Sequence, residues 1–209
     1  MQSDTSLPPT NNQRLALRKQ LRQRRTALSA SERIGAAQAL VAQLERIPEF
    51  LTDRRIGGYW AVAGELPLLA LMAGLRARGQ TYCLPIVGAD RQLAFGPWHP
   101  GDAIEANRYG IPEPACAIAD RLAPGQLDVV LLPLLGFDRR GHRLGSGGGY
   151  YDRSFAFLRG RREIGTPVLV GVGYALQEVA AIEAMPWDVG LDYVATEREL
   201  IDFTPPLSS

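Results

Sequence analysis

The sequence predicts an α/β fold in which a sheet of mostly parallel strands packs against helices. Between residues 56 and 87, two short β-prone runs flank a segment of helical texture, and strand–helix–strand is the unit that connects parallel strands. The run 127–135 is apolar throughout, as expected of a central strand covered on both faces. The 209 residues, 46% of them apolar, suit one domain or at most two small ones. We expect a single domain over 13–209, preceded by a polar, mobile tail over 1–12.

The first two expected elements are helices. Residues 13–28 carry leucines at helical spacing and six basic side chains without an acidic one, which predicts a basic amphipathic helix. Ser29 and Glu32 match a capping box and predict the start of a second helix, which Pro48 is expected to end. The residues expected to face inward are Leu17, Leu21 and Leu28 in the first helix and Ile34, Ala37, Val41 and Leu44 in the second.

The remaining elements follow from alternating β-prone and helical textures. The expected strands cover 56–61, 81–87, 93–98, 127–135, 167–175 and 192–195. One helix is expected over 66–79 and another directly after the glycine-rich stretch near residue 150. The order of these elements shows no internal repeat and favours one α/β domain.

Composition excludes several classes of protein. No apolar run approaches the roughly 20 residues that cross a bilayer, and the N-terminal residues lack the features of a signal peptide. Cys83 and Cys116 are too few for a disulfide scaffold, and His99 and His142 lie too far apart for a zinc-ligand pair. We therefore expect a cytoplasmic protein that does not interact with a membrane.

The basic residues are almost all arginine. Of the 23 basic residues, 22 are arginine and only Lys19 is lysine. A Walker A loop, a protein kinase and Schiff-base chemistry each need a lysine at a defined place, and Lys19 follows no glycine loop. If the protein binds phosphate, it must use arginines and backbone amides, with or without a metal ion.

A glycine-rich stretch follows the central apolar run. Residues 145–152, GSGGGYYD, include four glycines in five positions, and glycines let backbone amides close around an anion. Ligands of open α/β sheets bind beyond the carboxyl ends of the strands, where this stretch lies. Arg143 supplies a cationic fork, and Asp152 offers an oxygen ligand to Mg²⁺. The alternative is a flexible turn, because glycine clusters are common in loops.

The residues around this stretch carry a resemblance to a known family. Residues 137–153 read FD-x-x-G-x-RLG-x-GGGYYDR, which resembles the signature of 5-formyltetrahydrofolate cyclo-ligases, also called methenyltetrahydrofolate synthetases. The likeness extends to a basic first helix ending in LSASER, a strand followed by a glutamate, a GIPEP loop and a terminal LDYVAT. It implies a three-layer α/β/α fold like that of sugar-phosphate isomerases and CoA transferases. It also implies an enzyme that uses ATP and Mg²⁺ to convert 5-formyltetrahydrofolate into 5,10-methenyltetrahydrofolate, with release of ADP and phosphate.

The resemblance further implies roles for single residues. Arg14 would face ATP and Arg18 both ATP and the folate; the family often has lysine at the position of Arg14, so a planar fork replaces a point charge. The residues expected around ATP are Arg14, Arg18, Arg143, Leu144, Gly145, Ser146, Gly147, Gly148, Gly149, Tyr150 and Tyr151. Those expected around the folate are Arg18, Trp60, Glu65, Tyr109, Ser146, Gly147, Gly148, Gly149 and Tyr150. Catalytic roles would fall to Arg18, Arg143 and Tyr150, and Mg²⁺ would be held by Asp152 and Asp192.

Other interpretations remain open from the sequence. Glu65 also suits the start of a helix, Trp60 suits a core, and Ser146 replaces the larger residue that the family carries. A nucleotide or phosphosugar sensor would explain the glycines, but it needs neither metal nor folate contacts. An RNA-binding protein would explain the first helix, but a net charge of +1 and the lack of interleaved aromatic residues argue against nucleic acid. We expect a monomer, with Lys19, Arg22, Arg24 and Arg25 on a solvent-exposed helix face.

Overall fold

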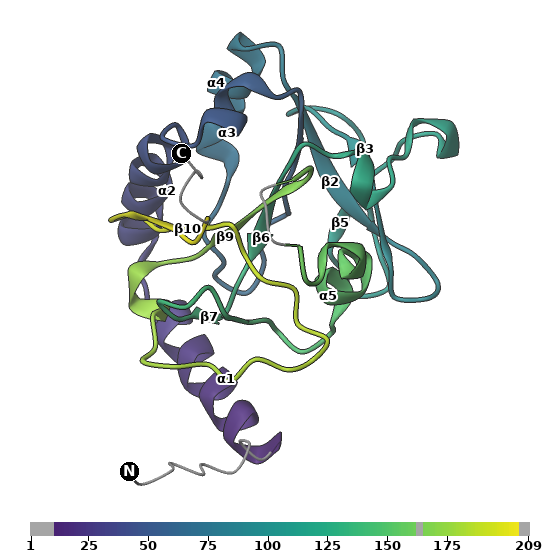
Figure 1. The fold of residues 1–209 in the computed structure, drawn as a ribbon. Helices are drawn as coiled ribbons and strands as arrows, with labels where there is room; N and C mark the ends of the chain where they lie inside the picture. Colours follow the sequence, from purple (N-terminus) through teal and green to yellow (C-terminus); the bar gives the residue numbers. More distant parts are fainter. Residues whose placement is uncertain (1–10, 162–164, 205–209) are drawn as a thin grey trace, which may run out of the picture.

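The computed structural model describes residues 11–161 and 165–204, and a seven-stranded sheet forms its centre (Figure 1). The strands of this sheet are β1 (Arg55–Gly57), β2 (Thr81–Val87), β3 (Leu93–Pro97), β6 (Val129–Pro133), β9 (Val168–Val172), β10 (Tyr193–Ala195) and β11 (Leu200–Asp202). They lie in the order β11-β10-β9-β6-β1-β2-β3. The five inner strands are parallel, and the two edge strands β3 and β11 run antiparallel to their neighbours. The α/β class predicted from the sequence is confirmed.

Two antiparallel strand pairs lie outside this sheet. They are β4 (Ile104–Ala106) with β5 (Pro112–Pro114), and β7 (Gly136–Phe137) with β8 (Arg143–Leu144). The second pair matters for the site, because β8 leads directly into the glycine-rich stretch.

The helices are short after the first two. They are α1 (Asn11–Thr26), α2 (Ala30–Leu44), α3 (Pro48–Thr52), α4 (Met72–Ala77) and α5 (Tyr150–Ser154). Single 3-10 turns are η1 (Leu69–Leu71), η2 (Ile118–Asp120), η3 (Pro124–Gln126), η4 (Ala156–Leu158) and η5 (Ala175–Gln177). Within the described ranges, no helix is long and apolar enough to cross a membrane.

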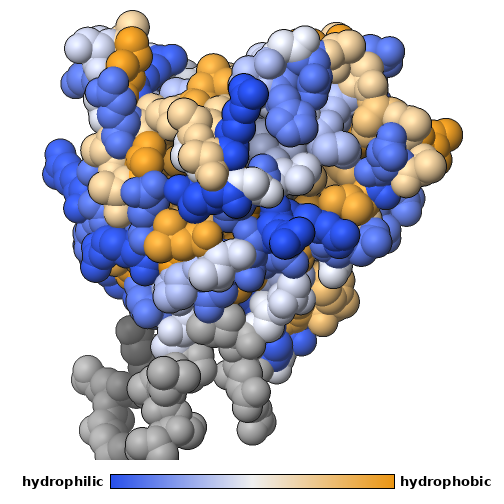
Figure 2. All heavy atoms as spheres, turned by 90° about the horizontal axis from the view of Figure 1, so that it is seen from above, coloured by the Kyte–Doolittle hydropathy of each residue, from blue (hydrophilic) through white to orange (hydrophobic). Residues whose placement is uncertain are grey.

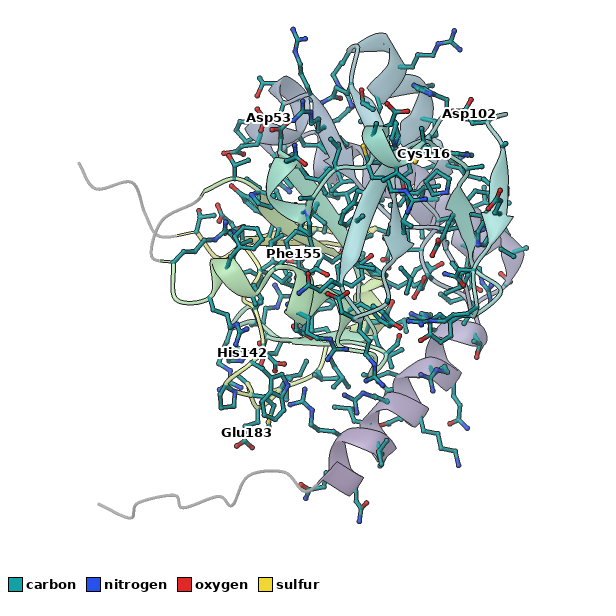
Figure 3. All side chains as sticks on the ribbon, turned by 90° about the vertical axis from the view of Figure 1, so that its right-hand side faces the viewer. Asp53, Asp102, Cys116, His142, Phe155 and Glu183 are labelled. Carbon is teal, nitrogen blue, oxygen red and sulfur yellow. The ribbon has the colours of Figure 1, made fainter. Side chains whose placement is uncertain are left out.

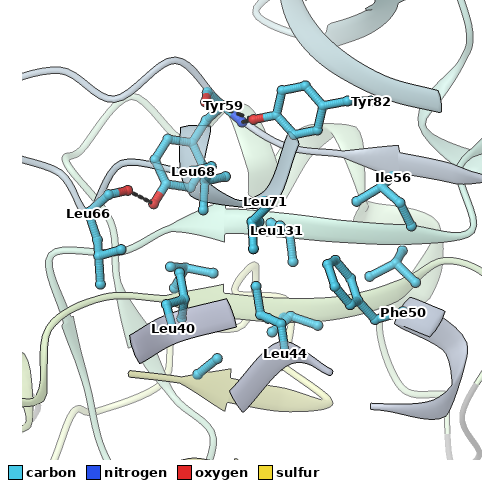
Figure 4. Close-up of a cluster of buried hydrophobic side chains, with 14 of the residues drawn as sticks. Leu40, Leu44, Phe50, Ile56, Tyr59, Leu66, Leu68, Leu71, Tyr82 and Leu131 are labelled. Carbon is cyan, nitrogen blue, oxygen red and sulfur yellow. Dashed lines mark hydrogen bonds between the residues drawn. The ribbon is translucent and has the colours of Figure 1, made fainter. Parts of the chain in front are cut away.

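The sheet separates two hydrophobic layers, which confirms the three-layer arrangement. Side chains alternate between the faces of a strand, so Val129 and Leu131 of β6 belong to one cluster and Val130 and Leu132 to the other. The first cluster packs against α2, α3 and α4, and Figure 4 shows part of it. The second packs against α5 and η4, with Phe155 buried in the interior (Figure 3). Both faces are thus covered, as the apolar run 127–135 predicted.

The first two helices differ from the expectation in detail. Helix α1 begins at Asn11, so residues 11 and 12 are helical; apolar spacing could not mark this first turn, because it has no apolar residue. The rest of the expected tail, 1–10, lies outside the described residues. The capping box of Ser29 and Glu32 is confirmed. Ile34 is 58% exposed, because the inward face of α2 is formed by Ala36, Ala37, Leu40 and Leu44.

Strand β1 ends at Gly57, although the sequence predicted a strand to residue 61. The Tyr82 hydroxyl fills the space beside Gly58, and a Cβ at Gly58 would lie 2.2 Å from it. The backbone N–H of Tyr59 donates to this hydroxyl (3.0 Å), so the chain leaves the sheet here (Figure 4). Residues 59–65 are therefore available to form a wall above the sheet.

The carboxyl ends of the parallel strands point toward α1. Asp53, which precedes β1, lies at the opposite end of the molecule from His142 and Glu183 (Figure 3). The amino end, seen from above in Figure 2, mixes hydrophilic residues with smaller apolar groups. The end beside α1 gathers the residues expected around the ligands.

Candidate active site

A cavity of about 630 Å³ opens at the carboxyl ends of the parallel strands. Its floor includes Pro133 at the end of β6 and Pro85 and Val87 at the end of β2. Its walls come from α1, the segment 59–65 after β1, the turn 107–111, the glycine-rich stretch and residues 187–188. Segments far apart in the sequence therefore meet around one hollow.

Helix α1 places two of the predicted arginines on this hollow. Arg14 donates to the carbonyl oxygen of Glu183 (2.9 Å) and lies 3.7 Å from the Asp188 carboxylate. Arg18 donates through Nε to the carbonyl oxygen of Gly145 (3.0 Å), which ties α1 to the glycine-rich stretch. Burial lowers the pKa of Arg18, and the charges of Arg14 and Arg22 lower it further. This concentration of positive charge favours an anionic ligand.

The glycine-rich stretch has unused hydrogen-bond donors. Gly147 has φ +108° and Gly149, directly before α5, has φ +67°, which are backbone conformations that favour glycine. Among the described residues, the backbone N–H groups of 145–149 donate to no partner. Because these N–H groups are not committed to other parts of the chain, the stretch can close around phosphate oxygens.

Arg143 and Asp152 form an ion pair beside this stretch. Arg143, 8% exposed, donates to Asp152 Oδ1 and to the carbonyl oxygen of Val189. Asp152 Oδ1 also accepts from the Val189 N–H (3.4 Å), whereas Oδ2 accepts no hydrogen bond from the described chain. One carboxylate oxygen therefore remains available to a cation.

Glu65 also lines the cavity, from the tight turn 62–65. Its side chain is 10% exposed and its Oε2 accepts from the Val62 N–H (3.1 Å). Burial raises the pKa of Glu65, against the Val62 N–H and the positive charge of Arg25, which lower it. Trp60 lines the same wall and packs edge-on against Trp98, with 5.6 Å between ring centroids. A carboxylate and an aromatic ring thus line the same part of the cavity.

Two tyrosines meet at the exposed edge of the cavity. The hydroxyls of Tyr109 and Tyr150 are 2.5 Å apart, and Arg108 donates to the Tyr150 hydroxyl (3.3 Å). The hydrogen bond with Tyr109, followed by that with Arg108, lowers the pKa of Tyr150. The pair connects the turn 107–111 to α5.

Most of the predicted site residues line the cavity, and two do not. Leu144 is buried against Leu21 and Leu135 below it. Asp192 precedes β10 at the amino edge of the sheet, where it accepts from the Leu169 N–H (2.7 Å) and pairs with Arg161. The two expected magnesium ligands therefore do not lie together, because Asp152 is at the carboxyl ends of the parallel strands and Asp192 is at their amino ends. Within 11–161 and 165–204, no three histidine, cysteine or acidic side chains form a metal-binding group.

Sequence reasoning missed several residues of the cavity. Arg25 was expected on the solvent-exposed face, but it is 2% exposed and lines the cavity. The signal was present, because Arg25 lies four residues after Leu21 and three before Leu28 on the apolar face of the helix. The other charged, polar or aromatic lining residues that it missed are Arg22, Tyr59, Arg91, Asn107, Arg153, Arg159, Trp187 and Asp188.

Charge and shape define the class of ligand. Eight arginines and three carboxylates line the cavity, so a polyanion is strongly favoured on the wall formed by α1 and 145–149. The wall formed by 59–65 presents aromatic and carboxylate groups, which suit a heterocycle with N–H donors. Fold and site together define an α/β protein whose cavity suits a polyanion and a ring compound.

Comparisons with known proteins assign the family. Residues 10–197 match the model of the 5-formyltetrahydrofolate cyclo-ligase family, and the chain belongs to this family of ligases. It is 31% identical over 182 residues to the 5-formyltetrahydrofolate cyclo-ligase of Escherichia coli strain K12, covering 86% of this chain and 98% of that one. It is 29% identical over 180 residues to the cyclo-ligase of Haemophilus influenzae, covering 85% and 94%.

Solved structures agree with this assignment. The fold is similar to that of Aquifex aeolicus 5,10-methenyltetrahydrofolate synthetase, with a TM-score of 0.79, 26% identity and coverage of 94% of this chain and 95% of that one. The 5,10-methenyltetrahydrofolate synthetase of Mycoplasma pneumoniae gives a TM-score of 0.68, with 26% identity and coverage of 88% and 98%. The family resemblance stated from the glycine-rich motif is confirmed.

Proposed function

We propose that the cavity converts 5-formyltetrahydrofolate into 5,10-methenyltetrahydrofolate and couples this step to cleavage of ATP into ADP and phosphate. The observation that carries the proposal is the pairing of two unlike walls in one cavity. Arginines and free backbone amides line one part of the cavity, and Glu65 and Trp60 line another part. A chain of the cyclo-ligase family with this cavity has a place for each co-substrate.

The triphosphate is assigned to the wall of α1 and the glycine-rich stretch. Arg14, Arg18 and Arg143 present guanidinium groups, and 145–149 present unpaired N–H groups. Arginine and backbone amides bind phosphate oxygens without a lysine, which agrees with a chain that has only Lys19.

The folate is assigned to the wall formed by 59–65. An ionised Glu65 accepts hydrogen bonds from the amino group and ring N–H of a pterin, and Trp60 and Tyr109 offer aromatic contacts. The two walls share one hollow, so the formyl group of the folate can approach the terminal phosphate of ATP.

Asp152 is the residue that fits a magnesium ion. Mg²⁺ in nucleotide sites is held by one or two carboxylates together with phosphate oxygens and water, and Asp152 Oδ2 has no other partner within the described residues. A bound Mg²⁺ would neutralise phosphate charge. Asp192 does not fit this role here, because its carboxylate is engaged by Arg161 and Leu169.

The proposed chemistry places few demands on covalent catalysis. The formyl oxygen attacks the γ-phosphorus of ATP, and the bond from that phosphorus to ADP breaks. The neighbouring amine nitrogen of the folate adds to the activated carbon, loses its proton, and phosphate leaves with the former formyl oxygen. Arg18 and Arg143 stabilise charge on the transferred phosphoryl group, and Tyr150 offers a hydroxyl at the edge of the cavity.

The test is direct. The protein is mixed with 5-formyltetrahydrofolate, ATP and MgCl₂, and methenyltetrahydrofolate is followed by absorbance while ADP is measured in parallel. We expect about one ADP for each product molecule and no product when ATP or Mg²⁺ is omitted. Product formation without ATP would refute the mechanism, and no product at all would refute the function.

Three further properties belong to the proposal. One chain supplies every wall of the cavity, which supports a monomer with a small-molecule folate and ATP as partners. The strands of the sheet span residues 55 to 202, and Leu21 of α1 packs with Leu135 and Leu144, which supports one domain over 13–209. Cys83 and Cys116 are free thiols, as expected of a cytoplasmic protein.

A further inference from the structure

Arg25 is unusual among the cations of α1 because it is buried. Its Nη2 donates to the carbonyl oxygen of Ala63 (3.0 Å) and its Nη1 to that of Leu134 (3.5 Å). Nη1 also lies 3.8 Å from Glu65 Oε1. The Nε atom is buried and has no hydrogen-bond partner within the described chain. Burial of an arginine with incomplete pairing is unfavourable for stability, which suggests that its position serves the cavity it lines.

The turn that Arg25 contacts is strained and carries Glu65. Ala63 has φ +49° and Gly64 has φ +80°, and the Glu65 N–H donates to the carbonyl oxygen of Val62 (3.0 Å). A positive φ is uncommon for a residue other than glycine and persists where the surroundings impose it. The hydrogen bond from Arg25 to Ala63 is one such restraint. Arg25 therefore contacts both the backbone of this turn and the carboxylate that follows it.

We propose that Arg25 is a positioning residue for the folate: it holds the 62–65 turn and orients the Glu65 carboxylate toward the pterin. This inference rests on the proposed function. Arg25 acts through Glu65 and the turn, whereas Arg14 and Arg18 of the same helix are assigned to ATP. Loss of Arg25 should therefore weaken folate binding and spare ATP binding.

The electrostatics of Glu65 give a second consequence. Burial raises the pKa of Glu65, and only the Val62 N–H and the charge of Arg25 oppose this effect. Without that charge, Glu65 takes up a proton at higher pH and loses acceptor capacity for the pterin. As the pH is lowered, a variant without the Arg25 charge should therefore lose folate binding at a higher pH than the wild type does. The titratable or charged groups near Glu65 and its turn are Arg25, Arg33, Tyr59, Tyr151 and Tyr174.

The test compares Arg25→Gln with Arg24→Gln. Arg24 is exposed, lies next to Arg25 and does not line the cavity, so it controls for loss of one charge from α1. Steady-state kinetics give KM for folate and for ATP, and calorimetric titration gives the Kd for 5-formyltetrahydrofolate without ATP between pH 5.5 and 8. For Arg25→Gln we expect the folate KM and Kd to rise about tenfold or more, with the ATP KM within about twofold of wild type. Arg24→Gln should behave as wild type.

Two additional variants keep the inference testable if Arg25→Gln is unstable. Arg25→Lys keeps the charge and loses the fork, so the pH dependence of folate binding should stay near wild type while affinity falls. Arg25→Gln combined with Glu65→Gln should bind folate no more weakly than Glu65→Gln alone, because Arg25 acts through Glu65.

Several outcomes would overturn the inference. The inference is wrong if the folate Kd of Arg25→Gln is within twofold of that of Arg24→Gln. It is also wrong if Arg25→Gln loses equal affinity for ATP and folate, or if the double variant shows an additive loss of folate affinity. If Arg25→Gln is too unstable to measure, an unchanged folate Kd in Arg25→Lys would overturn the inference. Wild-type protein that forms no methenyltetrahydrofolate would refute the proposed function instead, so the two failures are distinguishable.

Discussion

The phosphate-binding role of the glycine-rich stretch is tested by Gly147→Ala. Gly147 has φ +108°, a region that residues with a Cβ avoid, and an added Cβ would meet only the Arg18 guanidinium, at 3.9 Å. The methyl group therefore fits in space, and the penalty comes from the backbone. Holding alanine in such a conformation costs about 1–3 kcal/mol. If the stretch relaxes to relieve this strain, its N–H groups turn away from the phosphate positions.

Gly101→Ala provides a matched control for the same strain. Gly101 has φ +103°, and a Cβ there would meet nothing within 4 Å. It lies outside the cavity lining, so it carries a similar backbone penalty without a phosphate to bind. Both variants should lose comparable stability in urea unfolding if neither segment relaxes.

The assay is calorimetric titration with a non-hydrolysable ATP analogue and Mg²⁺. A loss of about 1–3 kcal/mol corresponds to roughly a 5- to 150-fold rise in Kd, because about 1.4 kcal/mol is a factor of ten. We expect this rise in Gly147→Ala and none in Gly101→Ala. Wild-type affinity in Gly147→Ala, or an equal loss in both variants, would show that 145–149 is a flexible turn and not a phosphate site.

Three more predictions concern single side chains. Asp152→Asn should lower turnover by about 100-fold or more and change the magnesium titration, whereas Asp192→Asn should lower thermal stability and leave the titration unchanged; the reverse pattern would return the metal to Asp192. Arg18→Lys keeps its charge but loses the planar fork, so kcat/KM should fall about 30-fold, for a loss of about 2 kcal/mol, while melting temperature changes little; unchanged ATP and folate kinetics would contradict its assignment. Asp138 is fully buried, and although burial raises its pKa, hydrogen bonds from the N–H groups of Ile182, Arg140 and His142 keep that pKa below the ordinary value. A lowered folded-state pKa stabilises the fold above the unfolded-state pKa near 3.8, and this contribution disappears as pH falls through the folded-state value. Asp138→Asn should therefore lose about 2–4 kcal/mol in urea unfolding at pH 7 and less at pH 3, and an equal loss at both would contradict the linkage.

Local patterns in the sequence predicted the elements that depend on near neighbours. The capping box of Ser29 and Glu32 depends on residues three apart, and the strand over 81–87 was predicted with its observed bounds. The run 127–135 predicted a strand covered on both faces, and the motif 137–153 predicted the family. Each of these features is encoded within one short segment.

Only the tertiary structure decided which side chains meet. Gly58 ends β1 because Tyr82, from the next strand, occupies the space beside it, and no local pattern contains that contact. Strand β11 forms because β10 offers an unpaired edge. Asp192 lies outside the expected metal site because it is at the amino ends of the parallel strands. The sequence by itself determined the fold class, the family and a set of candidate arginines, glycines and carboxylates. The burial of Arg25 beside Glu65 depended on where α1 and the 62–65 turn come together, because contacts between distant segments arise from packing of the whole chain.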